Sequence, residues 1–528
     1  MVKNWNEIEL RNMVLKNSYG LDCMPYQYLF FKIDEEPYHS LKSICLKIYV
    51  REGKARLVLN EYKGSPVIEV EGSREVEIPS EFCEMGENIL AYKGDLQVEW
   101  VRFLEKEKAC NSQEREMPEA ENHEGRNLLA VNQAAEFLLN AQIPFTETHT
   151  AFEGSCYAIY DETNRCYRMP CWLWSDAPVV SAALALAKSP YGKEQKEKLE
   201  RLAYSIGEVF LKTQIADETE EAFGALVSRY RYYNKKERSF DCLLGLNDTS
   251  YSVKWALLPL YEYTGDRRYL TAARQALDWV EKYVYKLDFA PSHYYFEEKR
   301  WENRAFVDTG FCPEGFEQYQ KVGKDRDYTK TIDFIMSRFL SQFSLHNGYY
   351  GQNYFPEKGV DNRLFTRGHA WVLEGLLACM RTLKKDCYVL AARELVENMI
   401  NLQRPDGSFS YLMGYGEPSA KELDGSGTCE KATAIFAYLF LEYDRLQHDP
   451  KVRQAAGKAL NWCENNMSLQ EGPGFGGIYG ESLVSGITGL PYLNVATGYG
   501  NAYYIMAKLN FLYTNQKLLD RASPMEYN

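Results

Sequence analysis

The chain has 528 residues, of which 45% are hydrophobic and 26% charged, and this composition excludes a largely disordered, fibrous or collagen-like protein. Its 61 basic and 74 acidic side chains give a formal charge of −13, which disfavours a nucleic-acid partner because no basic stripe offsets it. No signal-peptide core and no membrane-spanning apolar run is visible, so we expect a cytoplasmic protein without membrane contact. The cysteines form no CxxC pair and the histidines no HExxH motif, so neither a metal site nor a cofactor is predicted.

Short runs that alternate apolar and polar residues occupy positions 26–104. They are bounded by Gly, Pro, Asp and Ser, as half-buried antiparallel strands require. The seven runs read YQYLFFKI, SICLKIYV, ARLVLNEY, PVIEV, REVEI, ENILAY and LQVEWVRF. We therefore predict a small antiparallel β-sandwich over residues 1–105, as an accessory domain. Residues 106–126 are polar and acid-rich, which predicts a solvated linker.

Beyond the linker the apolar period changes from 2 to about 3.6, which predicts helices. They come in pairs, in which the first helix is apolar on nearly every side and the second is amphipathic. AWVLEGLLACM is an example of the first kind and RRYLTAARQALDWVEKYVY of the second. The predicted helices cover residues 127–142, 175–188, 194–215, 249–264, 267–286, 310–322, 327–342, 368–383, 386–403, 429–446, 450–467 and 498–514.

The joints between paired helices repeat along the chain. Similar segments begin at positions 261, 319, 380 and 443, at intervals of 58, 61 and 63 residues. Such a period indicates one supersecondary unit copied around an array. We therefore predict a mainly α fold, in which residues 127–528 form an (α/α)6 toroid of six helical hairpins. An open superhelix of helix pairs is the alternative architecture.

Polar and aromatic residues stand where the six apolar helices begin, and in a toroid these helix starts would converge on one funnel. Ser, Thr, Asp and Asn at such positions are often N-caps, but Trp, Arg, His and Tyr are not cap residues. Aromatic rings with polar edges suit sugar faces, and the chain has 40 Tyr and 9 Trp. We therefore predict a carbohydrate site that includes Trp174, Asp176, Asp248, Asp308, Arg367, His369, Trp371, Thr428, Glu430 and Tyr499.

Four segments then point to a known family. FVDTGFCPEGFEQYQKVGKDRDY resembles the acid-bearing helix of the unsaturated glucuronyl and unsaturated rhamnogalacturonyl hydrolases, which release 4,5-unsaturated uronic acids from polysaccharide-lyase products. FTRGHAWVLEGLLACM resembles their Trp-x-Arg-Gly-Asn/Gln-x-Trp helix start. PDGSFSYL with SGTCEKATAIFAY, and NDTSYSVKWALLPLYEYTGD, are similar to their late and early site segments. The resemblance covers residues 240–445 and more loosely 127–515.

This resemblance implies a glycoside hydrolase in which Asp308 is the general acid and base and Asp248 the second carboxylate. It also implies that Arg367 and Trp371 bind an acidic oligosaccharide substrate, without a cofactor. The chain departs from the family pattern at Phe365, in place of Trp, and at His369, in place of Asn or Gln. Lys431 stands where the family prefers small residues.

In the implied reaction, Asp308 protonates C4 of a vinyl ether while water adds at C5, and the hemiketal then opens and expels the leaving sugar. Burial and a nearby carboxylate would raise the pKa of such an aspartate. Three alternatives remain at this point: a glycosidase of saturated uronides, a sugar epimerase on the same toroid, and a non-catalytic glycan-binding protein. The sequence leaves the oligomeric state open.

Overall fold

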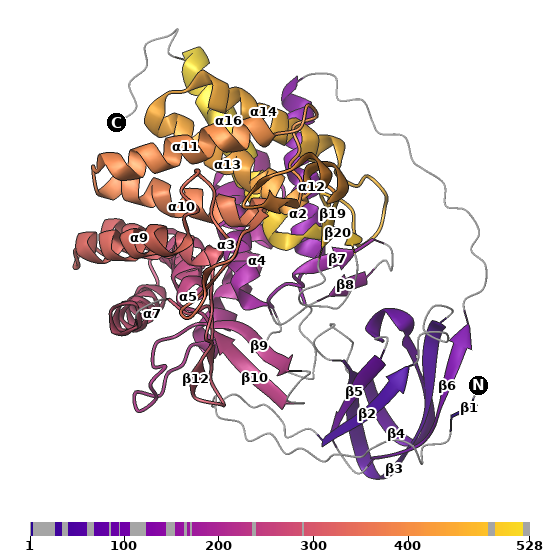
Figure 1. Cartoon of the computed structure of the whole chain (residues 1–528). Coiled ribbons are helices and arrows are strands. Elements are labelled where there is room, and N and C mark those ends of the chain that lie inside the picture. The colour runs from indigo at the N-terminus through magenta and orange to yellow at the C-terminus, as the bar shows by residue number, and fades with distance from the viewer. Residues whose placement is uncertain are drawn as a thin grey trace. The chain divides into compact units, whose positions relative to one another are not determined.

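The computed structural model of the chain describes residues 2–3, 27–33, 41–60, 68–83, 86–93, 96–105, 123–143, 154–162, 166–168, 172–234, 239–287, 290–483 and 492–520. The chain divides into two compact units. The first contains residues 1–116, 144–153 and 166–170, and the second contains residues 117–143, 154–165 and 171–528. In Figure 1 the first unit consists of β-strands and the second unit is mainly helical.

The first unit is an antiparallel sheet whose strands follow the order β1-β6-β3-β5-β2, with β4 paired to β3. The bounds are Val2–Lys3 (β1), Gln27–Ile33 (β2), Leu41–Leu59 (β3), Ile68–Pro79 (β4), Gly86–Lys93 (β5) and Leu96–Glu105 (β6). The first half of β3 pairs with β6 and the second half with β5. Side chains from both halves, among them Ile44 and Leu57, share one buried core. Both halves of the long strand therefore contribute to that core.

The alternating runs predict more strands in this region than form. SICLKIYV and the ARLVL part of ARLVLNEY both lie in β3, and β4 contains the IEV part of PVIEV together with REVEI. The predicted break is a bulge, where the β3–β4 register shifts between Tyr49 and Lys54. Gly53 and Gly72 take positive φ there, 68° and 63°, which glycine adopts without steric cost. Bulges and turns favour the same residue types, so the sequence alone does not distinguish a bulge within one strand from a turn between two strands.

The described helices of the second unit form six hairpins, as predicted. Each inner helix is followed by its outer partner except the last, α16, which packs on α2 from the start of the unit. The inner helices are α3 (Ala177–Lys188), α5 to α6 (Leu246–Thr264), α8 (Pro313–Val322), α10 (Thr366–Thr382), α13 (Glu430–Gln447) and α16 (Gly498–Asp520). The outer helices are α4 (Lys196–Thr213), α7 (Arg267–Lys286), α9 (Thr329–Phe343), α11 (Asp386–Leu402), α14 (Pro450–Asn465) and α2 (His123–Asn140).

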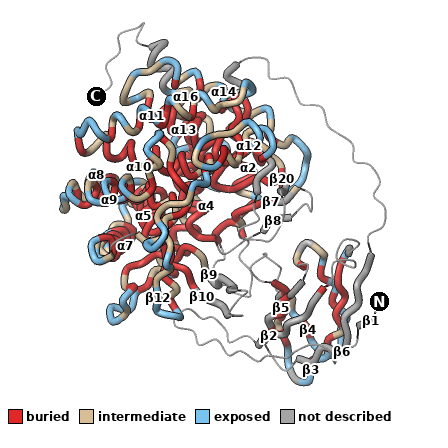
Figure 2. Tube along the Cα trace, in the orientation of Figure 1, coloured by how far each residue is buried: buried red, intermediate tan, exposed pale blue. Residues whose placement is uncertain are grey.

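The inner helices close into a ring. Each contacts the next along the chain, and α16 returns to pack against α3. An open superhelix would leave the first and last inner helices apart, so this contact excludes it. Figure 2 shows buried residues concentrated on the inner helices and exposed residues on the outward faces of α7 and α11. The prediction of an (α/α)6 toroid is thereby confirmed for this unit.

Helix α2 and the second inner helix differ from the sequence prediction in ways that matter for the fold. Helix α2 begins at His123, so the last residues of the predicted linker are helical, while residues 106–122 lie outside the described part of the chain. The second inner helix contains a π-helical segment, Val253–Leu257, between α5 (Leu246–Ser252) and α6 (Leu258–Thr264). Lys254 in that segment pairs with Glu314 of α8, and its Nζ lies 3.7 Å from Oε1 of Glu374 in α10. Buried polar contacts thus join three inner helices.

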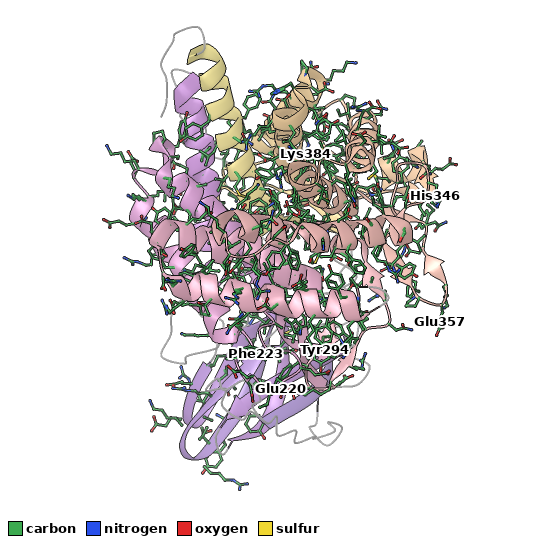
Figure 3. All side chains as sticks on the ribbon, turned by 90° about the vertical axis from the view of Figure 1, so that its left-hand side faces the viewer. Glu220, Phe223, Tyr294, His346, Glu357 and Lys384 are labelled. Carbon is green, nitrogen blue, oxygen red and sulfur yellow. The ribbon has the colours of Figure 1, made fainter. Side chains whose placement is uncertain are left out.

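The connections that lead into the inner helices carry short antiparallel strands. These are β7 (Ile159–Asp161), β9 (Val227–Asn234), β10 (Ser239–Leu244), β11 (Tyr294–Tyr295), β12 (Arg300–Trp301), β13 (Ala305–Phe306), β14 (Asn353–Phe355), β15 (Gly359–Val360), β16 (Arg363–Phe365), β17 (Leu412–Tyr415), β18 (Glu417–Pro418), β19 (Gly480–Leu483) and β20 (Tyr492–Thr497), while β8 (Cys166–Arg168) belongs to the first unit. Their sheet orders are β12-β11-β10-β9, β13-β14-β15, β16-β17-β18 and β19-β20-β7. Figure 3 labels residues of these connections, such as His346 and Glu357, and Lys384 in the tight turn between α10 and α11.

None of the described helices is both long and apolar enough to cross a bilayer.

Candidate active site

One cavity of the second unit lies where the inner helices begin. Its volume is about 320 Å³. Six of the residues that the sequence predicts for a carbohydrate site line it: Trp174, Asp248, Asp308, Arg367, Trp371 and Tyr499. Together with Lys431, they come from the starts of all six inner helices, so the cavity is the funnel that a closed toroid requires. Its other polar lining residues include Arg229, His293, Glu302, Arg304, Gln352, Asn353, Arg363 and Tyr411.

The two aspartates are placed by the close approach of two inner helices. Asp248 lies in the first turn of α5, and Asp308 lies in a 3-10 turn, Val307–Phe311, just before α8. Gly315 of α8 has no room for a side chain, because a Cβ there would lie 2.4 Å from Oγ of Ser250. The Ser250 hydroxyl donates a hydrogen bond to the carbonyl of Cys312 at 2.5 Å. These contacts fix the 3-10 turn against α5.

The next inner helix, α10, is held against the same 3-10 turn by glycines. A Cβ at Gly375 would lie 1.8 Å from the carbonyl oxygen of Gly310, and a Cβ at Gly368 would lie 2.6 Å from Cγ1 of Val307. Only glycine permits so close an approach. As a result, Arg367 at the start of α10 reaches the cavity beside Asp308, and its charge lowers the pKa of that carboxyl.

Asp308 is suited to hold a proton at neutral pH. Burial, and next the like charge of Asp248, raise its pKa to about 7, against the opposing effect of Arg367 and Arg229. Its Oδ1 is buried and has no hydrogen-bond partner. The Asp308 side chain as a whole is half-buried, and its exposed part faces the cavity. A proton donor that is open to a ligand but enclosed by protein fits general acid chemistry.

Asp248 is more deeply buried, at 6% exposure, and burial raises its pKa. The charge of His293 is the largest opposing effect, followed by the interaction with the Ser228 hydroxyl and then by the charges of Arg229 and Arg367. Asn247 donates a hydrogen bond from Nδ2 to Oδ1 of Asp248 at 3.2 Å. The two aspartates therefore interact as a pair, in which a charge on one disfavours a charge on the other.

The cavity lining also combines a cation with aromatic rings. Arg367 Nη1 donates to the hydroxyl of Tyr499 at 3.2 Å. The rings of Tyr499 and Trp174 lie 5.3 Å apart. Trp371, one helical turn after Arg367, packs edge-on against Phe311, with ring centres 5.3 Å apart. An arginine that is held in place among flat rings can bind a carboxylate on a sugar.

Two predicted residues on the inner helices do not reach the cavity lining. His369 is fully buried, its Nδ1 lies 2.9 Å from the carbonyl of Phe365, and its Nε2 accepts from the backbone N–H of Tyr350 at 3.1 Å. Burial lowers its pKa to about 4, so it is neutral at pH 7. Asp176 is also buried and accepts from the backbone N–H of Cys156 at 3.3 Å. Both side chains hold neighbouring segments in place.

The segment before α13 places its charges differently from our prediction. Thr428 forms a β-bridge with Ser410, and neither it nor Glu430 lines the cavity. Glu430 is 1% exposed and pairs with Lys431 at 3.0 Å. Lys431 itself lines the cavity, whereas the sequence marks it only as a departure from the family pattern. Adjacent residues on a helix point in directions about 100° apart, so a one-residue difference decides which of them faces the ligand.

Arg229 and His293 are among the cavity residues that sequence reasoning missed. Arg229 lies in β9, with its guanidinium 4.4 Å from the centre of the Trp172 ring, and His293 directly precedes β11. Both come from the connections between helices, whereas the sequence pattern points only to residues at helix starts. The alternating run SRYRYY and the aromatic cluster SHYYF were the available signals. Among the residues that the structure describes, no group of three or more His, Cys, Asp or Glu side chains could hold a metal ion.

Comparisons by sequence find no matching family model and no matching curated protein. Comparison of structures does find similar folds. An unsaturated glucuronyl hydrolase from Bacillus sp. GL1 is 15% identical, with a TM-score of 0.53 over 72% of this chain and 96% of that one. The enzyme of the same name from Streptococcus agalactiae is 15% identical, with a TM-score of 0.51 over 73% and 91%. A possible GH105 family member from Klebsiella pneumoniae is 13% identical, with a TM-score of 0.51 over 77% and 100%.

The structural match covers these proteins almost completely. At identities this low, such a match establishes a shared fold. The chain therefore has the six-hairpin toroid fold of the unsaturated glucuronyl hydrolases and GH105 proteins, as its sequence resemblance implied.

Proposed function

We propose that this protein is a glycoside hydrolase that releases a 4,5-unsaturated uronic acid from acidic oligosaccharides. The observation that carries the proposal is the pair of aspartates that line one cavity, with the pKa of Asp308 raised to about 7 by burial and by the charge of Asp248. In such a pair a charge on one carboxyl disfavours a charge on the other, which favours retention of one proton. The fold and the motif resemblance support the same reaction class.

In the proposed reaction, the Asp308 carboxyl gives its proton to C4 of the vinyl ether. Positive charge then develops at C5 and the ring oxygen, and the nearby Asp248 carboxylate stabilises it. A water molecule forms a bond to C5 and transfers a proton to the Asp308 carboxylate, which restores the acid. The resulting hemiketal opens and expels the leaving sugar.

Arg367 is the proposed partner of the uronate carboxylate. Its guanidinium can make two parallel hydrogen bonds to a carboxylate, and the Tyr499 hydroxyl fixes its orientation. Trp174 and Trp371 line the same cavity and offer aromatic faces to the sugar rings. Two of the similar structures support an acidic substrate. One is named for dGlcA-Glc-Rha-Glc, and the other is an unsaturated glucuronyl hydrolase mutant complexed with dGlcA-GalNAc6S.

We further propose that the toroid, residues 127–528, is the catalytic domain and that residues 1–105 form an accessory domain. The cavity supports this division because every residue that lines it belongs to the second unit.

The test is incubation of the purified protein with a panel of unsaturated disaccharides from several lyases, with matched saturated disaccharides alongside. We expect the ultraviolet absorbance of the conjugated double bond to disappear while the leaving sugar is released in equal amount. Hydrolysis of the saturated compounds alone would instead indicate an ordinary glycosidase, and isomerisation without release would indicate an epimerase. Binding detected by calorimetry with no turnover of any compound would indicate a glycan-binding protein.

A further inference from the structure

An exposed aromatic side chain lies next to the cavity lining and has no role in the proposed reaction. Tyr415 ends β17 and is 53% exposed. It is the direct cross-strand partner of Arg363 in β16, and Arg363 lines the cavity. Side chains of directly opposed residues project from the same face of a sheet, with Cβ atoms about 5 Å apart. Tyr415 therefore continues the surface that Arg363 contributes to the cavity.

The next cross-strand pair supports this direction. It joins Leu364 to Gly414, and Leu364 is fully buried. Because side chains alternate between the two faces of a strand, Arg363 and Tyr415 share the face that points away from the core. Phe365, two residues after Arg363, also lines the cavity. The cavity side of this small sheet thus runs from Phe365 to Arg363 and on to Tyr415.

Hydrogen bonds hold this part of the sheet in place. Nε and Nη2 of Arg363 both donate to Oδ2 of Asp361, at 3.0 and 2.9 Å. In the turn after β17, the N–H of Gly416 donates to the carbonyl of Asn362 at 2.6 Å. Nδ2 of Asn347 donates to the carbonyl of Gly416 at 2.9 Å. A backbone that is fixed before binding loses little conformational freedom when a ligand arrives.

The chemistry of this pair suits an uncharged sugar. The ring of Tyr415 has an apolar face and a polar edge, which match the face and the hydroxyl groups of a sugar ring. Asp361 compensates the charge of Arg363, so the pair offers little net positive charge to a sulfate or a second carboxylate. Among the described residues none accepts from Nη1 of Arg363, which leaves that nitrogen as a donor for a sugar hydroxyl.

The place of the pair relative to Arg367 indicates which sugar it meets. A 4,5-unsaturated uronic acid is always a terminal ring, because its C4 carries no oxygen, so the rest of the substrate extends from its anomeric carbon only. Arg363 is exposed, whereas Arg367 is only partly exposed. The chain between them spans on the order of 10 Å. With the uronate on Arg367, the leaving side of the substrate extends toward solvent, where Arg363 and Tyr415 lie.

We propose that Arg363 and Tyr415 form a subsite for a neutral sugar on the leaving side of the substrate, beyond the disaccharide that contains the scissile bond. This inference rests on the proposed function, because it takes Arg367 as the partner of the uronate carboxylate. It implies that the protein binds longer unsaturated oligosaccharides more tightly than unsaturated disaccharides.

The test is calorimetric binding of two compounds to Asp308→Asn, a variant that should bind them without turnover. They are an unsaturated disaccharide and an unsaturated tetrasaccharide that has only neutral sugars after the uronate. We expect the tetrasaccharide to bind about fivefold more tightly, as for one aromatic contact. Adding Tyr415→Ala should remove this gain and leave the affinity for the disaccharide unchanged. Tyr285→Ala, at a tyrosine of α7 that is 49% exposed and does not line the cavity, is the matched control and should change neither affinity.

Two further measurements test the chemistry of the subsite. Tyr415→Phe keeps the ring, so it should retain most of the gain that Tyr415→Ala loses, whereas a merely structural effect of the alanine would also weaken the disaccharide. A tetrasaccharide that carries a sulfate on its third sugar should bind no more tightly than the neutral one, because Asp361 compensates Arg363. Tighter binding of the sulfated compound would overturn the assignment to a neutral sugar.

The outcomes separate this inference from the proposed function. Equal affinities for the two compounds, or an equal loss of both in Tyr415→Ala, would overturn the subsite even if the wild type releases uronic acid from each. If the proposed reaction is wrong but the subsite exists, the wild type will show the same dependence of affinity on length and release no uronic acid. Failure of both compounds to bind would overturn the subsite and the proposed function together.

Discussion

Replacing Asp308 by Asn should stabilise the fold while abolishing activity. The change keeps the shape of the side chain but removes a carboxyl group whose ionised form the folded protein disfavours. Burial and Asp248 raise the pKa of Asp308 to about 7. Ionising it therefore costs free energy in the folded state that it does not cost in the unfolded chain.

The magnitude follows from that pKa. A pKa of about 7 lies about three units above the ordinary aspartate value, and each unit corresponds to about 1.36 kcal/mol, which gives at most about 4 kcal/mol. Because the folded-state pKa is raised, the favourable contribution of the protonated group is complete below about pH 4. It is lost as pH rises from about 4 to 7, and the loss is complete above pH 7.

The assay is chemical denaturation of wild type and Asp308→Asn at several pH values, with the free energies of unfolding compared. The variant should match the wild type near pH 4 and exceed it by up to about 4 kcal/mol at pH 7 to 8. Asp327→Asn is the control, because Asp327 accepts from the N–H and hydroxyl of Thr329 and these bonds lower its pKa. It should lose stability at neutral pH. An Asp308→Asn protein no more stable than wild type at pH 7 would refute the assigned environment.

Three further predictions concern activity and packing. Turnover should fall as pH rises through about 7, because Asp308 then loses the proton that it donates, and a pH profile that rises through this range would contradict that role. Arg367→Lys keeps the charge but loses the planar fork, so KM for a uronide should rise about tenfold or more while KM for the carboxyl-reduced analogue stays the same; equal changes for both would argue against carboxylate binding. Gly375→Ala should lower the free energy of unfolding by several kcal/mol, because its Cβ would lie 1.8 Å from the Gly310 carbonyl, whereas Gly425→Ala, with open space around it, should change little in the same denaturation assay.

The toroid and the convergence of its helix starts could be predicted from sequence because both follow from periodicity. A 60-residue repeat of an apolar and an amphipathic helix has few ways to bury its apolar faces, and a closed ring is one of them. Asp248 and Asp308 then meet because corresponding positions of neighbouring repeats lie side by side. Arg367 and Trp371 are four residues apart, which places both on one face of α10.

Side-chain direction within a helix start was harder to predict. His369 is two residues after Arg367, a rotation of about 200°, so it points away from the cavity and bonds to neighbouring backbone. For the same reason, Lys431 faces the cavity and the neighbouring Glu430, which we predicted for the site, does not. His293 and Glu302 could not be found by periodicity at all, because their contact depends on how a short hairpin folds between two helices.

The most direct test of the central claim is the reaction of an unsaturated disaccharide in deuterated water, followed by NMR at early times. Protonation at C4 by Asp308 predicts a product with one deuterium at C4, in a single stereochemical position, and none at the anomeric carbon. Asp308→Asn should form no such product, with its fold intact. Release of the uronic acid without deuterium at C4 would show that the glycosidic bond is cleaved directly, and it would contradict the vinyl-ether hydration on which this account rests.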